Sequence, residues 1–243
     1  MLRVQQTGAI VPFTSDEHAF QQLGEAREAP EDYQPLVFIH IPKTAGTSFR
    51  QAAEESLGLH AVAKDYGTAS PATSALVQQT VYSDRVDELL GHMHAQGIQM
   101  LSGHFPAKRY AHVFRQRVRW CTFLRDPVQR VISEHEHLVR HGVYAEPLMN
   151  FCQLGGQRNK QIRMLNGLGP DELFFVGITE QYRRSIEVFN QKAQTDFHYL
   201  EENVARSSLE KLHEVPRDVL EMIREQNAEE IAFYKRYEAR YAE

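Results

Sequence analysis

The chain has 243 residues, of which 42% are hydrophobic and 24% charged, as in a globular protein with one α/β domain, with or without a helical appendage. Its net charge of −5 argues against nonspecific nucleic-acid binding but allows a local basic pocket. Two cysteines, Cys121 and Cys152, are too few for a disulfide framework, and no apolar run approaches the length of a membrane span. We therefore expect a cytoplasmic protein with no membrane span and no nucleic-acid partner.

The first predicted element is a buried strand that follows a polar N-terminus. Residues 1–34 are polar, so we expect an N-terminal arm packed on a domain that spans residues 35–243. Residues 36–41 form a short apolar run rich in β-branched and aromatic side chains, which breaks at Pro42. This pattern predicts a strand and then a tight turn.

Helical periodicity begins directly after this turn. Apolar residues share one helix face over residues 49–57, and Gly58 stands where a C-terminal cap would end the helix. Residues 59–82 are rich in Ala, Ser, Thr and Gly and show no clear periodicity. We predict a long surface loop there that shapes the access of substrate.

Helices and strands then alternate along the chain. The predicted elements are a helix over 83–96, a strand over 97–102 ending at Gly103-His104, a strand over Arg119–Leu124, a helix over 128–141, a strand over 173–178, a helix to residue 191, and an amphipathic C-terminal helix from residue 216, interrupted near Asn227. Strands separated by helices predict an α/β fold, in which a parallel sheet is covered by helices on both faces. In such sheets the ligand lies at the carboxyl ends of the strands.

The segment after the first strand has the features of an anion site. It consists of Lys43, Thr44, Ala45, Gly46, Thr47 and Ser48. Strand, turn and helix start in this order present free N–H groups and the positive end of the helix dipole to one point. Lys43 adds a full charge and the three hydroxyls add donors, which favours phosphate or a similar tetrahedral anion over the alternative of an ordinary capped helix. Because Lys43 precedes Gly46, this is not the P-loop pattern G-x-x-x-x-G-K-[ST].

The string HIPKTAGTSF, residues 40–49, resembles the 5′-phosphosulfate-binding loop of sulfotransferases that use 3′-phosphoadenylyl sulfate (PAPS). It looks most like the branch that acts on carbohydrates, which includes the heparan sulfate 2-O-sulfotransferases. The resemblance implies the sulfotransferase fold, a P-loop-like parallel sheet with helices on both faces, and PAPS as the donor co-substrate. It also implies that Lys43 and the amides of Gly46–Ser48 bind the phosphosulfate. Animal relatives are anchored in the Golgi, whereas this chain shows no anchor, so we expect either a cytoplasmic, bacterial protein or a trimmed form of an anchored one.

A second anchor, RDPVQRVIS, follows the strand predicted over 119–124. Arg125 stands at the strand end and Ser133 lies two turns into the next helix, so both can reach one anion. We expect Asp126 to cap this helix and Arg130 to pair with Asp126; a capped helix with one ion pair is the alternative interpretation. R-D-P-x-x-R-x-x-S resembles the 3′-phosphate-binding motif of the same sulfotransferases, and the first anchor lies about 80 residues upstream, as that family requires.

Weaker resemblance to the family continues elsewhere. Residues 159–167 (NKQIRMLNG) and 175–182 (FVGITEQY) look like family segments, and so do residues 203–207 (NVARS). In relatives a loop near the last position closes over the adenosine. The resemblance therefore implies that Arg206 and Ser207 contact the nucleotide.

His104 is the candidate catalytic base. Sulfuryl transfer from PAPS to a hydroxyl needs a group that removes the hydroxyl proton, in-line positioning, and stabilisation of the charge on the leaving phosphate. A neutral imidazole suits the first task, and Lys43 suits the last. His104 resembles the proposed catalytic histidine of the heparan sulfate branch, which often has His-Gly-His where this chain has Ser102-Gly103-His104. The alternative is a structural histidine at a strand end.

Other titratable residues have weaker claims to a function. His135, His137 and His141 share one predicted helix, but H-E-x-x-H is absent, so we expect no metal and interpret them as a solvated face or as a wall that faces the acceptor. We expect His92 and His94 to lie on the surface. A basic patch fits either attraction of an anionic acceptor or an ordinary screened surface. Its members are Lys108, Arg109, Arg115, Arg117 and Arg119.

These observations favour a PAPS-dependent sulfotransferase that acts on a hydroxyl of a sugar or glycoconjugate. Two alternatives stay open. A small P-loop-type nucleotide kinase is disfavoured, because the Walker sequence is absent and no acidic residue has an obvious claim to Mg²⁺. A nucleotide-binding module without turnover is disfavoured by the presence of both Lys43 and His104. No pattern in the sequence identifies the acceptor or the oligomeric state.

Overall fold

The computed structural model describes residues 23, 27–114, 116–199 and 212–241. Its centre is a five-stranded parallel sheet in the order β2-β3-β1-β4-β5. The strands are β1 (Leu36–Ile39), β2 (Val62–Asp65), β3 (Met100–Gly103), β4 (Arg119–Leu124) and β5 (Leu173–Ile178). Strands β2 and β3 lie on one side of β1, and β4 and β5, which come later in the chain, lie on the other. The carboxyl end of β1 is therefore the point at which the strand order reverses.

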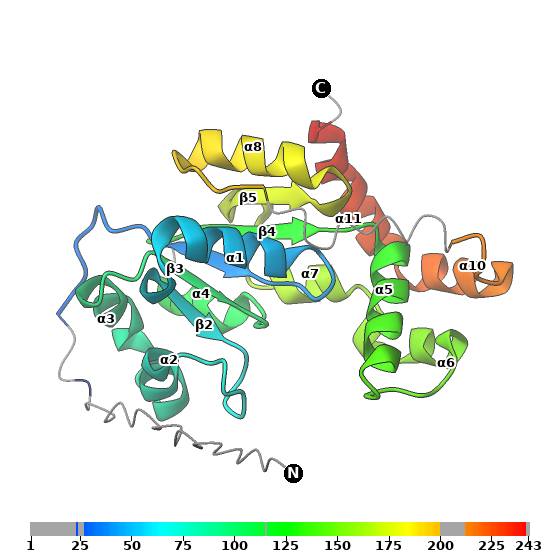
Figure 1. Ribbon diagram of the computed structural model, residues 1–243, viewed down its shortest axis with the longest axis horizontal. Helices are drawn as coiled ribbons and strands as arrows, with labels where there is room; N and C mark the ends of the chain where they lie inside the picture. The colour runs from blue at the N-terminus through cyan, green and yellow to red at the C-terminus, as the bar shows by residue number, and fades with distance from the viewer. Residues whose placement is uncertain (1–22, 24–26, 115, 200–211, 242–243) are drawn as a thin grey trace, which may run out of the picture.

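Helices cover both faces of the sheet, which confirms the predicted fold class (Figure 1). Leu36 and Phe38 of β1 pack in the cluster that includes α1 (Gly46–Leu57) and α8 (Tyr182–Ala193). Val37 and Ile39 turn to the opposite face. The cluster on that face includes residues of α2 (Ala75–Thr80), α3 (Leu89–Ala95), α4 (Lys108–Phe114), α7 (Lys160–Leu165) and α11 (Ala228–Glu238). Burial on both faces explains why β1 reads as a continuous apolar run.

A helical projection stands beside the sheet (Figure 1). It consists of α5 (Pro127–Arg140), α6 (Leu148–Gln153) and α10 (Arg217–Gln226), which enclose a smaller core of their own. Short 3₁₀ turns lie at Leu59–Ala61, Val81–Ser83, Val86–Glu88, Gly155–Gln157, Pro170–Glu172, Thr179–Gln181 and Ala239–Tyr241. None of the helices in the described part of the chain has the length and apolar character that a membrane span requires.

Several predicted elements agree closely with the structure. Strands β4 and β5 have the predicted bounds. Helix α5 is capped as predicted by Asp126, whose side chain accepts the backbone N–H of Gln129 at 2.9 Å. The predicted interruption at Asn227 separates α10 from α11. The helix predicted over residues 83–96 begins later, at Leu89, after two 3₁₀ turns.

The loop predicted over residues 59–82 is wrong, because this segment contains β2 and α2. Strand β2 is an edge strand that pairs with β3, and it ends at Asp65, which is only 1% exposed. The carboxylate accepts hydrogen bonds of 2.7 Å from the hydroxyls of Tyr82 and Tyr110. These partners are distant in the sequence, so the local pattern carries no signal for the strand.

Two predictions about single side chains are also wrong. Arg130 pairs with Glu134, one turn further along α5, rather than with Asp126, whose carboxylate already caps the helix. Arg130 is completely buried, so this pair belongs to the interior and not to a helix surface. His92 is a buried residue, 3.5 Å from a carboxylate oxygen of Glu88, and not a surface histidine.

Candidate active site

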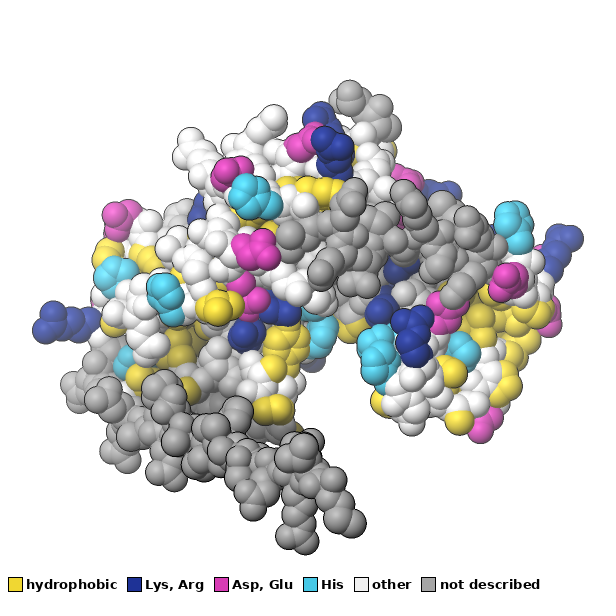
Figure 2. Space-filling view, in the orientation of Figure 1, with side chains coloured by type: hydrophobic (Ala, Val, Ile, Leu, Met, Phe, Trp, Pro, Cys, Tyr) yellow, Lys and Arg dark blue, Asp and Glu magenta, His cyan; other side chains and the backbone are white. Residues whose placement is uncertain are grey.

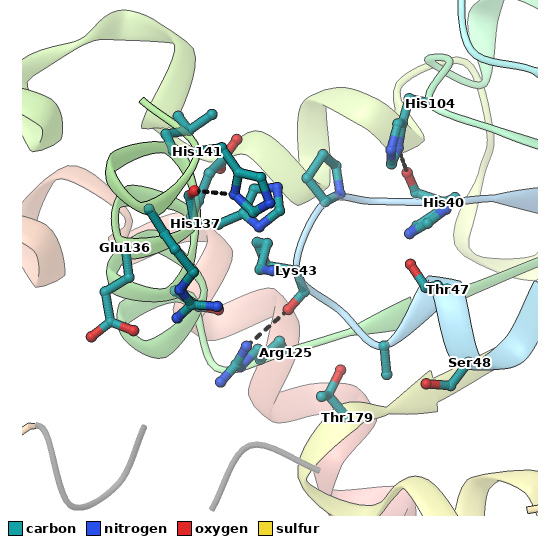
Figure 3. Close-up of a pocket in the computed structure, with 17 residues that line it drawn as sticks. His40, Lys43, Thr47, Ser48, His104, Arg125, Glu136, His137, His141 and Thr179 are labelled. Carbon is teal, nitrogen blue, oxygen red and sulfur yellow. Dashed lines mark hydrogen bonds between the residues drawn. The ribbon is translucent and has the colours of Figure 1, made fainter. Parts of the chain in front are cut away.

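A cavity of about 700 Å³ opens at the carboxyl ends of the central strands (Figure 3). One side of the cavity is lined by residues that follow the strands. In sheet order these are His104 after β3, the loop at Lys43 after β1, Arg125 after β4 and Thr179 after β5. Helix α5 lines the opposite side. In the space-filling view the molecule is hollowed between the sheet and the helical projection, with histidine, lysine and arginine side chains along the hollow (Figure 2). The full lining is His40, Pro42, Lys43, Ala45, Gly46, Thr47, Ser48, His104, Arg125, Ser133, Glu134, Glu136, His137, Leu138, Arg140, His141 and Thr179.

The turn after β1 has an uncommon backbone. Lys43 and Ala45 both have positive φ angles, 70° and 63°, which are disfavoured for residues other than glycine. Between them, the hydroxyl of Thr44 donates to the carbonyl of Ile41 at 2.9 Å and so holds the turn. Among the described residues, no side chain caps the start of α1 at Ala45. The residues of the first helical turn, Gly46, Thr47 and Ser48, line the cavity, and the N-terminus of a helix is a common site for an anion.

Gly46 is the position at which the helix start meets His40. A Cβ atom on Gly46 would lie 2.0 Å from Cδ2 of the His40 ring, so only glycine fits beside this imidazole. His40 is 6% exposed, and its Nδ1 lies 3.4 Å from the hydroxyl of Tyr66. Burial lowers the pKa of His40 well below its usual 6.5, and the charges of His104, Arg50 and Lys43 lower it further. His40 is therefore a neutral ring that packs against the predicted anion loop.

Lys43 and Arg125 bring the two predicted anchors together. Arg125 is 4% exposed, and its Nη1 donates to the carbonyl oxygen of Lys43 at 3.1 Å (Figure 3). Burial lowers the pKa of Lys43, and the positive charges of Arg125 and Arg140 lower it further. Ser133 of α5 lines the same cavity. Positive charges that repel one another in a partly buried cavity favour a bound anion.

The geometry of His104 suits a proton acceptor. Its Nδ1 lies 2.6 Å from the carbonyl oxygen of His40, and because a carbonyl can only accept, Nδ1 carries the ring proton and Nε2 keeps its lone pair. The side chain is accessible within the cavity. Desolvation by the surrounding protein lowers the pKa of His104 below 6.5, against the opposing effect of the bond to His40. The neutral form is therefore the one present near neutral pH.

The far wall of the cavity is the second half of α5. His137 and His141 line it together with Arg140, and the rings of the two histidines lie 4.2 Å apart (Figure 3). Nδ1 of His141 lies 2.7 Å from the carbonyl oxygen of His137. Of the two alternatives given for the histidines of this helix, the placement of His137 and His141 favours a wall of the cavity, whereas His135 does not line the cavity and contacts the carbonyl oxygen of Glu146. The described residues contain no group of three His, Cys, Asp or Glu residues that could hold a metal ion.

The predicted site residues differ in where they lie. Ala45, Gly46, Thr47, Ser48 and Ser133 line the cavity together with the residues discussed above, whereas Thr44 is completely buried in the turn and does not. Arg206 and Ser207 lie outside the described residues.

None of the described residues of the basic patch lines the cavity. Arg109 pairs with Asp65 at 3.0 Å, and Arg117 and Arg119 donate to backbone carbonyls. Lys108 is exposed, and Arg115 lies outside the described residues. Its described arginines are therefore engaged with the protein itself rather than with the cavity.

The lining also contains residues that were not singled out as site residues from the sequence, among them His40, Thr179 and Arg140. A signal existed for His40, since a histidine that interrupts an apolar strand just before an anion loop is unusual. Arg140 gave none, because a basic residue near a helix C-terminus is commonly explained by the helix dipole.

Comparison with known proteins finds likeness at the level of structure. No family model matches the chain, and no curated protein matches it. The structure is similar to that of the mouse sulfotransferase SULT7A1, solved as a complex with PAP, with 12% sequence identity, a TM-score of 0.47, and coverage of 79% of this chain and 70% of that one. It is also similar to a sulfotransferase from Alicyclobacillus acidocaldarius, with 15% identity, a TM-score of 0.48, and coverage of 84% and 95%. At these identities neither structure assigns a reaction to this chain.

Proposed function

We propose that the protein is a PAPS-dependent sulfotransferase that transfers a sulfuryl group to an acceptor hydroxyl. The observation that carries this proposal is that two separate anion anchors, the Lys43 loop and the Arg125–Ser133 pair, line one cavity, with a histidine on its wall. A nucleotide with phosphates at both its 3′ and 5′ positions needs two such anchors, whereas a nucleoside triphosphate carries its phosphates on one side only.

The chemistry of these anchors supports one orientation of the donor. The N–H groups at the start of α1 and the ammonium of Lys43 take the 5′-phosphosulfate, because both supply positive charge at one point. The guanidinium of Arg125 and the hydroxyl of Ser133 take the 3′-phosphate. Contacts of Arg206 and Ser207 with the adenosine stay predictions from the resemblance of their segment.

The reaction then needs one proton transfer and one substitution at sulfur. Nε2 of His104 accepts the proton of the acceptor hydroxyl while the oxygen forms a bond to sulfur. The bond between sulfur and the 5′-phosphate oxygen breaks in line, and its electron pair stays on the phosphate. Lys43 and the helix N-terminus stabilise the negative charge that develops there. The products are the sulfated acceptor and adenosine 3′,5′-bisphosphate (PAP).

For the acceptor we propose a hydroxyl of a sugar or glycoconjugate, in line with the resemblance of HIPKTAGTSF to the carbohydrate branch. The wall formed by His137, Arg140 and His141 is polar and offers hydrogen-bond donors, which suits an acceptor with many hydroxyl groups. The N-terminal arm over residues 1–34 and the cytoplasmic location stay predictions, and most of the arm lies outside the described residues.

A calorimetric titration tests the donor. We expect PAP to bind more tightly than ATP and to need no Mg²⁺. A preference for ATP that depends on Mg²⁺ would indicate the kinase alternative instead. A single-turnover assay with radiolabelled PAPS, run against a panel of glycans and small alcohols, then tests transfer. Tight binding of PAP without transfer to any acceptor would indicate the nucleotide-binding module.

A further inference from the structure

The backbone of Arg125, the residue after β4, is held by a side chain from another element. The amide of Gln161, on α7, accepts the N–H of Arg125 at 2.9 Å and donates to the carbonyl oxygen of Arg125 at 2.9 Å. Gln161 is completely buried. One side-chain amide thus satisfies both backbone groups of the residue that directly follows β4, as a neighbouring strand would.

The amide of Gln161 is itself held by a carboxylate on α11. Nε2 of Gln161 donates to Oε1 of Glu230 at 2.8 Å, and the backbone N–H of Gln161 donates to Oε2 at 2.7 Å. Glu230 is completely buried, and Nε of Arg130 lies 3.9 Å from Oε1. These partners fix which end of the Gln161 amide faces Arg125. A buried carboxylate is costly unless it is hydrogen-bonded in this way.

A second set of contacts connects α11 with Asp126, the residue after Arg125. The N–H of Asp126 donates to Oε1 of Glu180 at 2.9 Å, and the hydroxyl of Tyr234, on α11, donates to Oε2 of Glu180 at 3.0 Å. Helix α11 therefore reaches the end of β4 through two independent side-chain relays, although it does not itself line the cavity.

We propose that Gln161 and Glu230 are positioning residues for recognition of the 3′-phosphate. They fix the backbone of Arg125 where its buried side chain must enter the cavity and contact the carbonyl oxygen of Lys43. This inference rests on the proposed function, in which Arg125 binds the 3′-phosphate. A displaced Arg125 would lose the 3′-phosphate, while the loop at Gly46 would still hold the 5′-phosphate.

The test is a nucleotide preference, because a merely structural role would not change it. The affinities of PAP and 5′-AMP, which differ by the 3′-phosphate, are measured by calorimetry for the wild-type chain and for Gln161→Met. We expect the preference for PAP over 5′-AMP to fall about tenfold or more in the variant, since a charge-assisted contact is misplaced, with little change in the affinity of 5′-AMP.

Gln157→Met is the matched control. Gln157 is also a buried glutamine, 7% exposed, and its Oε1 accepts from Nη2 of Arg130 at 3.2 Å rather than from Arg125. This variant should lose stability and keep the nucleotide preference. Glu230→Gln, which keeps the size of the side chain, serves as the second test variant if Gln161→Met does not fold. Glu230→Gln should also lower the preference for PAP over 5′-AMP.

The outcomes separate the two proposals. The positioning role alone would be overturned if both Gln161→Met and Glu230→Gln kept the wild-type preference for PAP over 5′-AMP. It would also be overturned if the variants lost affinity for PAP and for 5′-AMP equally. A wild-type chain that does not distinguish PAP from 5′-AMP would overturn the proposed function and this inference with it.

Discussion

Lys43 and Ala45 occupy the left-handed region of backbone conformation, at φ 70° and 63°, in a turn that a glycine would form with less strain. Such conformations cost on the order of 1–3 kcal/mol each and persist where the surroundings impose them. Here the hydroxyl of Thr44 bonds the carbonyl of Ile41, and Arg125 bonds the carbonyl of Lys43. The strain therefore lies in the residues that would contact the donor.

Substitution of Lys43 should separate transfer from folding. Lys43→Ala removes the only full charge on the anion loop, so we expect the rate of sulfuryl transfer to fall about 100-fold or more, as for loss of a group that stabilises transition-state charge. The free energy of unfolding should change by less than about 1 kcal/mol, because the side chain is half-buried among other cations. Transfer rate and urea unfolding are measured, with the exposed Lys235→Ala as control. Near-normal transfer would exclude Lys43 from the mechanism.

His104→Ala should remove turnover without removing the nucleotide. The imidazole lines the cavity and contacts the carbonyl of His40, and the proposed mechanism needs it for the acceptor proton alone. We therefore expect the affinity for PAP to stay within about threefold of the wild type while transfer becomes undetectable, because the loss acts on proton transfer only. A parallel loss of rate and affinity would instead make His104 a contact of the nucleotide.

The pH profile follows from the lowered pKa of His104. The neutral ring is the active form, so transfer declines only when the pH falls below the pKa of this group. Desolvation places that pKa below the usual 6.5. The acid limb of kcat/KM should accordingly have its midpoint below pH 6.5, measured with an acceptor that does not titrate in this range. A midpoint above pH 6.5 would mean that another group is the base.

At the scale of elements, the start of α1 depends on the closeness of Gly46 to His40. In Gly46→Ala the new Cβ would lie 2.0 Å from the His40 ring, so either the ring or the helix start must move. We expect the affinity for PAP to fall about tenfold or more, because the N–H groups no longer converge on one anion. Gly155→Ala, where an added Cβ meets no atom within 4 Å, is the control for calorimetry. Unchanged affinity in a folded Gly46→Ala chain would contradict this role.

The elements that the sequence predicted correctly share one property. Strands β1, β4 and β5 are buried and apolar, and α5 begins with a cap and a proline, so local signals suffice for all of them. Strand β2 ends instead in Lys64 and Asp65, which resemble a surface loop when only the sequence is considered. The strand forms because Gly103 lets the carbonyl of Asp65 approach: a Cβ at position 103 would lie 1.8 Å from that oxygen. Pairings of this kind are not visible locally.

At the scale of the whole molecule, the sequence predicted which residues form the two anchors but not how the anchors meet. They meet because β1 and β4 are neighbours in the sheet, with Ile39 opposite Thr122, so the residues that follow these strands emerge side by side. Strand order is a global property that residue patterns do not encode. The same holds for the buried set Arg130, Glu134 and Glu230, which joins helices far apart in the chain.

Acid stability is a prediction for the whole molecule. His40 is buried and neutral, and its folded pKa lies well below 6.5, so the unfolded chain binds a proton more readily. The low folded pKa of His40 therefore increases the free energy of unfolding above pH 6.5. This contribution is lost as the pH falls from 6.5 toward the folded pKa. Urea unfolding at pH 7.5 and 5.5 should show a smaller pH dependence in His40→Asn than in the wild type, with the exposed His60→Asn as control. Equal pH dependence in both variants would contradict this role.

Helix α5 carries Ser133 at the end of its second turn and ends beside His141, and both residues line the cavity. A helix of 14 residues is about 21 Å long and moves as a stiff rod. A tilt of α5 that moves Ser133 away from the donor also moves His141 and the wall that faces the acceptor. Binding of the donor would therefore alter the affinity for the acceptor. Ordered binding of two substrates could thus arise from the stiffness of one rod, without any contact between them.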